Sequence, residues 1–132
     1  SPGNEPSVRI LLAEDNPMVR EIFIMGLERR GWHVEVARSG EEALGMWILR
    51  PFDIILMDLQ MSGMDGLEAT RRIRAKESGG NERVCIIGVT AHARRKIIEE
   101  CLKEGMDEVL TKPLKPKELE ETILRYLGKE QG

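Results

Sequence analysis

The sequence has few features that would tie it to a membrane, to DNA or to itself through disulfides. Its apolar runs are short and none approaches the roughly 18 residues of a transmembrane helix, so we expect no membrane insertion by this domain. The net charge is −3 and basic residues are scattered among acidic ones, which argues against direct nucleic-acid binding. Two cysteines, Cys85 and Cys101, lie in apolar settings without metal-ligand spacing, which predicts core packing in a reducing compartment, the cytoplasm.

Length and composition favour one globular domain. At 132 residues the chain needs one core, and 41% apolar with 33% charged residues is an ordinary globular balance. Residues 1–7, SPGNEPS, are expected to be a linker or a cloning remnant, 8–127 the domain and 128–132 a C-terminal tail. Because the sequence has no initiator Met, we expect a segment of a longer protein, which could itself carry a membrane anchor.

Short runs rich in Val and Ile alternate with stretches of helical spacing five times along the chain. The runs predict strands over residues 8–13, 33–37, 54–57, 84–89 and 108–110. The other stretches predict helices over 17–30, from Ser39 to just before Pro51, over 66–76 and 94–104, and from Pro116 onward. This alternation predicts an α/β fold, a doubly wound five-stranded parallel sheet with right-handed crossovers and helices on both faces.

Polar side chains at the expected helix starts can cap them. Asn16 precedes a proline, and Ser39 with Glu42 and Asp65 with Glu68 have capping-box spacing. The apolar residues expected to face the core are, in the first helix, Val19, Ile22, Phe23, Gly26 and Leu27, and in the fourth Ile97, Ile98, Cys101 and Leu102.

The stretch FDIILMDLQMSGMDG contains three aspartates with different expected roles. Ligands of open parallel sheets bind outside the carboxyl ends of the strands. Asp53 stands at the amino end of its strand, where a role at the strand start is expected, and Asp65 has the spacing of a helix cap. Asp58 directly follows the apolar run, where a carboxylate is costly unless something pairs with it.

Three other strands end in residues that can supply such pairing. The first strand runs into Glu14 and Asp15, the fourth ends at Thr90, and Lys112 follows the fifth. Carboxylates about 4 Å apart repel by roughly 4 kcal/mol at an effective dielectric near 20. The three carboxylates of Glu14, Asp15 and Asp58 at one edge therefore imply a divalent cation. All donors are oxygens, which favours Mg²⁺, with Mn²⁺ possible, over zinc. A carboxylate beside that metal can accept a phosphoryl group, whose other oxygens Thr90 and Lys112 would hold.

The segments LLAEDN, ILMDLQMSGMDG, GVTA and TKP resemble, in this order and spacing, the receiver domain of two-component response regulators, most closely that of hybrid sensor histidine kinases. The resemblance covers residues 8–127 and implies the flavodoxin-like strand order 2-1-3-4-5. It further implies that Asp58 takes a phosphoryl group from a phosphohistidine on a histidine kinase or histidine phosphotransfer domain and slowly loses it to water.

The same resemblance implies a role for each site residue. Asp15 and Asp58 match direct Mg²⁺ ligands, together with the backbone carbonyl of Gln60, and Glu14 matches an acid that acts through water. Thr90 matches a switch hydroxyl and Lys112 its charged partner. Further positions implied are Ala91, which leaves the site open, Gln60 and His92, whose side chains tune phosphate loss, and a bond before Pro113 that is often cis.

Two positions depart from the pattern. The family usually has Pro where Ser62 stands, which we expect to loosen the loop without touching the chemistry. Val109 occupies the position of a usual Tyr or Phe switch, so we hypothesise that signalling relies on the Thr90 loop or that the domain is chiefly a phosphorelay station.

Other functions fit parts of the same sequence. A stand-alone or output-linked response regulator has the same site. A metal-dependent aspartyl-phosphate phosphatase would need a second Asp where Gln60 stands. A degenerate receiver would lack site residues that are all present here, and a flavodoxin-type nucleotide binder would need a hydroxyl-rich loop after the first strand.

Overall fold

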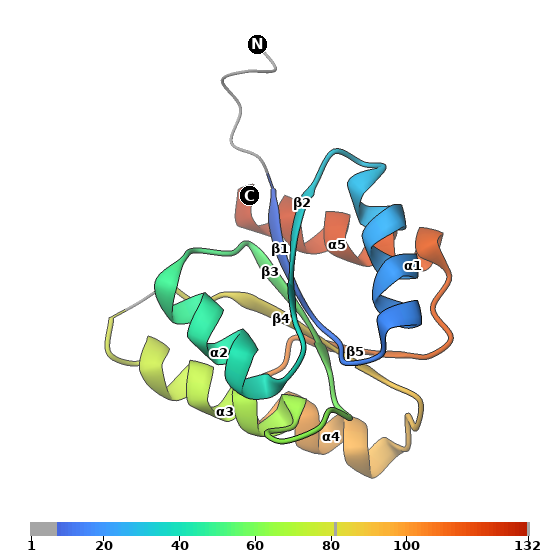
Figure 1. Cartoon of the computed structure of the whole chain (residues 1–132). Coiled ribbons are helices and arrows are strands. Elements are labelled where there is room, and N and C mark those ends of the chain that lie inside the picture. The colour runs from blue at the N-terminus through green and yellow to red at the C-terminus, as the bar shows by residue number, and fades with distance from the viewer. Residues whose placement is uncertain (1–7, 81, 132) are drawn as a thin grey trace.

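The computed structural model describes residues 8–80 and 82–131, and within them five parallel strands alternate with five helices (Figure 1). The strands are β1 (Arg9–Ala13), β2 (His33–Ala37), β3 (Ile54–Asp58), β4 (Cys85–Thr90) and β5 (Glu108–Thr111). The helices are α1 (Pro17–Glu28), α2 (Gly40–Leu49), α3 (Gly66–Glu77), α4 (Arg95–Lys103) and α5 (Pro116–Gln131). The sheet order is β2-β1-β3-β4-β5, so the predicted fold class and strand order are confirmed.

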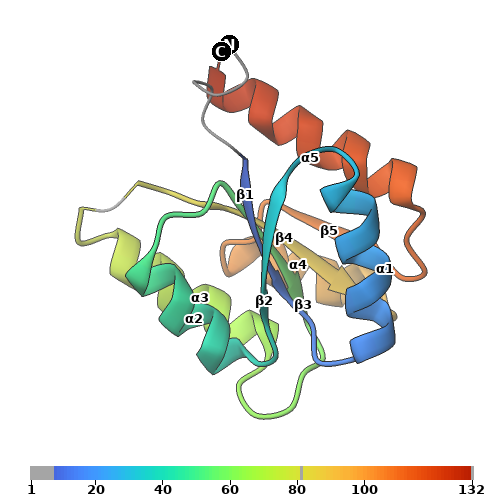
Figure 2. The same ribbon diagram turned by 45° about the horizontal axis from the view of Figure 1, so that its top comes forward.

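Each face of the sheet has its own apolar core, because successive strand residues point to opposite sides. Helices α2, α3 and α4 cover one face through Ala43, Ile73 and Cys101, among others. Helices α1 and α5 cover the other, where Phe23 and Ile123 are buried, and the two views show this division of the helices (Figures 1 and 2). Strands β3 and β4 are buried along their whole length, as expected for central strands of a parallel sheet.

All three predicted caps are present. Asn16 Oδ1 accepts hydrogen bonds from the backbone N–H groups of Met18 and Val19, Ser39 Oγ accepts one from Glu42 N, and Asp65 Oδ1 accepts one from Glu68 N. Each bond satisfies an otherwise unpaired donor of the first helical turn. The three caps fix where α1, α2 and α3 begin, and therefore the loops that connect them to β1, β2 and β3.

Two expected core residues are exposed, and these predictions are wrong. Ile22 in α1 is 56% exposed and Leu102 in α4 is 46% exposed. Each lies at the edge of an apolar stripe that is wider than the surface its helix buries. Cys85 and Cys101 are both buried, as predicted.

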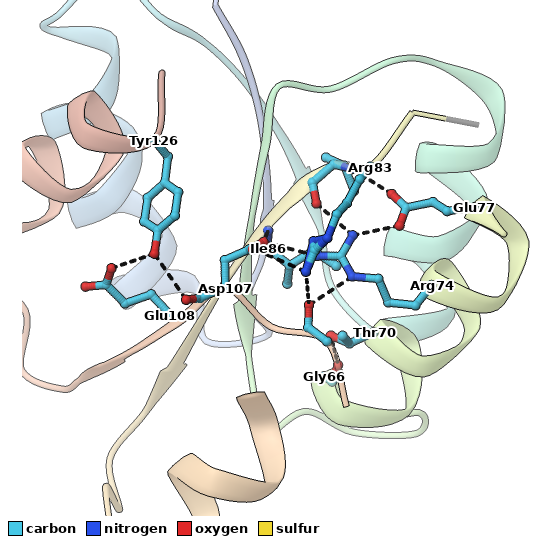
Figure 3. Close-up of polar contacts among 11 residues, drawn as sticks. Gly66, Thr70, Arg74, Glu77, Arg83, Ile86, Asp107, Glu108 and Tyr126 are labelled. Atoms are coloured by element: carbon cyan, nitrogen blue, oxygen red, sulfur yellow. Dashed lines mark hydrogen bonds and ion pairs between the residues drawn. The ribbon is translucent and has the colours of Figure 1, made fainter. Parts of the chain in front are cut away.

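Arg74 of α3 ties together segments that are distant in the sequence (Figure 3). Its guanidinium donates to the carbonyl oxygens of Gly105 and Val84 and to the carboxylates of Glu77 and Asp107, at 2.7 to 3.1 Å. Both acids also accept a backbone N–H bond, Glu77 from Val84 just before β4 and Asp107 from Ile86 in β4. Because all three nitrogens of the guanidinium donate hydrogen bonds, this network holds the α4–β5 turn against α3.

The expected linker 1–7 lies outside the described residues, while helix α5 continues through Gln131, beyond the expected domain end at 127. In the part of the chain that the structure describes, no helix has the length and apolarity to cross a membrane.

Candidate functional site

The predicted site residues meet at the carboxyl edge of the sheet. Asp58 is the last residue of β3 and Thr90 the last of β4, while Glu14 directly follows β1 and Lys112 directly follows β5. The sheet register continues past the strands through backbone bonds, among them Lys112 N to Thr90 O at 2.8 Å. The strands themselves, rather than a flexible loop, therefore position these four side chains.

The carboxylates of Glu14, Asp15 and Asp58 form one cluster. An oxygen of each lies within 4.8 Å of the others. Glu14 and Asp58 are 1% and 3% exposed, and Asp15 is half-buried, so the cluster opens to solvent on the Asp15 side. The structure thus brings together three residues that the sequence predicted as metal ligands.

Lys112 joins this cluster from β5. Its Nζ lies 3.1 Å from Glu14 Oε1 and 3.1 Å from Asp58 Oδ2. Burial would lower the pKa of Lys112, but its bonds to Asp58 and Glu14 outweigh burial and leave that pKa raised. The ammonium is therefore a fixed positive charge beside two buried carboxylates. The Lys112–Pro113 peptide bond is cis, as the resemblance implied.

One ammonium does not neutralise three carboxylates. Burial raises the pKa of Glu14, and the neighbouring Asp58 raises it further, while bonds from Asn16 N and Lys112 offset only part of the rise. A cluster whose members still repel one another, and whose donors are all oxygens, fits a divalent cation such as Mg²⁺.

Backbone donors hold the Asp58 carboxylate and the Thr90 hydroxyl in place. Gln60 N donates to Asp58 Oδ1 at 3.0 Å, and His92 N donates to Thr90 Oγ1 at 3.1 Å. Gly66 lies so close to Asp58 that a Cβ at this position would meet the Asp58 carbonyl oxygen. The loop after β3 thus returns directly over the strand end, and a side chain at position 66 would displace it.

Two residues outside the predicted set also touch the site. Arg20 of α1 donates to the carbonyl oxygens of Glu14 and Asp15 at 3.2 and 3.1 Å, which fixes the loop after β1. Ser62 donates its N–H to Asp15 Oδ2 at 3.2 Å, so this position contacts a predicted metal ligand, and the expectation that it leaves the chemistry untouched stays a prediction. A Pro in its place would lack that donor. No sequence signal predicts either contact, since Ser62 and Asp15 are 47 residues apart.

The position of the usual aromatic switch has a different packing. Val109 in β5 pairs with Gly88 in β4 and packs against the core on the α4 side. A Cβ on Gly88 would meet Met106 Sδ, so the Met106 side chain fills the space above that glycine. No aromatic ring is present at Val109 to change rotamer.

A family model for the response regulator receiver domain matches residues 10–124. The chain belongs to this family. Among curated relatives, the receiver domain is 40% identical over 122 residues to "Hybrid signal transduction histidine kinase I" of Dictyostelium discoideum, a match that covers 87% of this chain. The match covers 7% of that kinase, and the chain spans at most 14% of the other curated relatives compared with it, among them the sensor protein GacS of Pseudomonas syringae.

Solved structures agree with the assignment. The receiver domain of sensor histidine kinase PA1611 from Pseudomonas aeruginosa, with magnesium in its active site cleft, is 38% identical, has a TM-score of 0.84, and the match covers 93% of this chain and 99% of that one. The receiver domain of Ssk1 from Saccharomyces cerevisiae, crystallised with the histidine phosphotransfer protein Ypd1, is 29% identical with a TM-score of 0.84, covering 92% and 89%.

Proposed function

We propose that this receiver domain is the phosphoacceptor of a two-component phosphorelay and that Asp58 carries the phosphoryl group. The observation that supports this most is the position of Asp58 Oδ2. It is a nearly buried carboxylate oxygen, 3.1 Å from a lysine ammonium and beside two further acids, at the carboxyl end of a central strand. Asp53 and Asp65 have other partners, since Asp53 accepts from Arg9 N and Asp65 caps α3.

The transfer forms one bond and breaks one. A carboxylate oxygen of Asp58 bonds to phosphorus while the P–N bond to the donor imidazole breaks and its electron pair stays on the nitrogen. Such a transfer needs position and charge neutralisation more than acid–base chemistry. In the slow hydrolysis that follows, a water oxygen bonds to phosphorus, and the P–O bond to Asp58 breaks with its electron pair left on the carboxylate. Inorganic phosphate leaves, and the water's protons stay on it or pass to solvent.

The oxygen donors of the site suit Mg²⁺, with Mn²⁺ as a substitute. Asp15, Asp58 and the backbone carbonyl of Gln60 would bind the ion directly, and Glu14 would act through water. Such an ion neutralises charge that builds up on the phosphoryl oxygens. The magnesium in the PA1611 receiver, a relative at 38% identity, supports this choice.

Thr90 and Lys112 would bind the two remaining sides of the phosphoryl group. Lys112 already lies against Asp58 Oδ2, and its raised pKa keeps it charged at neutral pH. Thr90 Oγ1 accepts from His92 N, so its hydroxyl hydrogen is available to donate to an incoming oxygen. In this proposal a move of the Thr90 loop carries the signal, because Val109 offers no aromatic switch.

The donor would be a phosphohistidine on a histidine kinase or a histidine phosphotransfer domain, and the parent protein a hybrid sensor histidine kinase in the cytoplasm or anchored to its membrane. The likeness to the hybrid kinase of Dictyostelium and to a receiver crystallised with Ypd1 supports this context. A kinase core in the flanking gene sequence would separate it from a stand-alone regulator.

Incubation with acetyl phosphate and MgCl₂ tests the proposal. Intact-mass spectrometry should find one added phosphoryl group, lost on treatment with hydroxylamine and absent when EDTA removes the metal. Asp58→Asn should take up none, whereas Asp65→Asn, in the same loop, should be labelled like the wild type. Labelling of Asp58→Asn would contradict the proposal.

A further inference from the structure

Three consecutive cations, Arg94, Arg95 and Lys96, lie at the start of α4 on the edge of the sheet that carries the site. All three are exposed, and none has an ion-pair partner among the described residues. Arg94 lines a pocket together with Gln60 and Thr90. This cationic patch, residues 94–96, therefore borders the acceptor site.

The cationic patch is unfavourable for the helix that carries it. Arg94 occupies the N-cap position of α4 and makes no side-chain capping bond, and the first turn contains no acid. Cations at this end oppose the helix dipole. Helices α2 and α3, by contrast, begin with the side-chain caps Ser39 and Asp65 and carry Glu in the first turn. Residues that break such local rules without a local gain are expected at functional surfaces.

The charge of the rest of the chain indicates which kind of partner the patch attracts. The chain as a whole has a net charge of −3, and many of its other arginines are paired with acids, as Arg74, Arg83 and Arg125 are. An unpaired cationic area on a net acidic protein attracts an acidic partner in one orientation. Asp58 is 3% exposed, so a histidine that reaches it must come onto this edge, beside the pocket that Arg94 lines.

We propose that Arg94, Arg95 and Lys96 dock an acidic surface beside the phosphohistidine of the donor domain and select donors by that charge. This inference rests on the proposed function of the domain. It assigns the patch to the partner rather than to the chemistry at Asp58, so a small donor without a protein surface should not depend on it.

The test compares the wild type with the triple variant R94Q/R95Q/K96Q. The probes are acetyl phosphate and a panel of phosphorylated histidine phosphotransfer domains, Ypd1 included, ranked by the charge around their histidine. The variant should accept phosphate from acidic donors about 10-fold more slowly at low salt, with the difference fading as salt rises. Its rate with acetyl phosphate should change by less than about 2-fold, because this small anion has no protein surface that docks on the patch. Its Tm should rise by about 3 °C, because unfavourable charges leave the start of α4.

A matched control removes the same charge from the opposite edge. R29Q/K76Q/K103Q changes three exposed cations at the ends of α1, α3 and α4, none of which has an ion-pair partner in the described part of the chain. This variant should accept phosphate from every donor at the wild-type rate. A rise in Tm together with slower transfer in the patch variant alone would separate docking from a structural role.

Three results would overturn the inference. These are equal loss in both triple variants, a loss that does not depend on donor charge or salt, and unchanged transfer from acidic donors, whether or not the patch binds vesicles of anionic lipid. A wild-type domain that takes no phosphate from acetyl phosphate would instead refute the proposed function, so the two failures are distinguishable.

Discussion

Replacing Asp58 by Asn should make the metal-free domain more stable. The carboxylates of Glu14, Asp15 and Asp58 have oxygens within 4.8 Å of one another, so at an effective dielectric near 20 each pair repels by at least about 3.5 kcal/mol. Lys112 Nζ, 3.1 Å from Asp58 Oδ2, attracts it by about 5 kcal/mol on the same scale. The two repulsions on Asp58 exceed this attraction by about 2 kcal/mol, which is the expected gain in unfolding free energy.

Mg²⁺ should reverse the order. A ligand that binds only the folded state stabilises it by about 2.7 kcal/mol at 100 times its dissociation constant. The wild type should gain that amount and Asp58→Asn much less, because one of the metal ligands is lost. Urea unfolding in EDTA and in MgCl₂, at slightly alkaline pH, measures both differences, with equal m-values for the two proteins.

Asp65→Asn is the matched control for this experiment. Asn caps a helix about as well as Asp, so its stability should stay within about 0.5 kcal/mol of the wild type in both buffers. The electrostatic reasoning would be refuted if Asp58→Asn were less stable than the wild type in EDTA. It would also be refuted if Mg²⁺ stabilised the wild type and Asp58→Asn equally.

Three further substitutions or titrations test other parts of the account. Arg74→Ala should cost about 3 kcal/mol in urea unfolding because it leaves the buried Glu77 without its ion pair. Arg72→Ala, on an exposed pair, should cost under about 0.5, and equal costs would contradict the network. Gly66→Ala should cost about 2 kcal/mol and slow labelling by acetyl phosphate, because its Cβ meets the Asp58 carbonyl, while Gly45→Ala in open space should be neutral or stabilising. Burial and a bond to Glu108 raise the pKa of Tyr126, the single tyrosine, to about 12, so phenolate absorbance should titrate near there when folded and near about 10 in denaturant. Its contribution to stability is present below the unfolded pKa and is lost as pH rises through the folded one.

Local rules explain why much of the fold could be predicted from the sequence. Each cap needs only a side chain and a backbone N–H two or three residues away, and Asn16, Ser39 and Asp65 all have that spacing. The site residues could be predicted because they directly follow apolar runs, and parallel strands end at one edge. Those rules placed Asp58 beside Lys112, although 54 residues separate them.

Contacts that involve loop residues far apart in the sequence follow no local pattern that would predict them. Ser62 donates to Asp15 across 47 residues, and Arg74 of α3 reaches Asp107 across 33. Asp15, Ser62 and Asp107 lie in loops whose course depends on the whole fold. Ile22 shows a second limit of prediction from the sequence. Helical spacing places it next to the buried Phe23, but the part of α1 that packs on the sheet is too narrow to bury Ile22 as well. The pattern predicts which residues can be buried, and the packing decides which of them are.

Mapping the phosphorylated residue tests the central claim most directly. The domain is labelled with acetyl phosphate and MgCl₂, the acyl phosphate is trapped by borohydride reduction, and peptides are sequenced by mass spectrometry. The account predicts that the reduced residue is Asp58 and that neither Asp53 nor Asp65 is modified. Reduction found at Glu14, Asp15, Asp53 or Asp65 instead would contradict it.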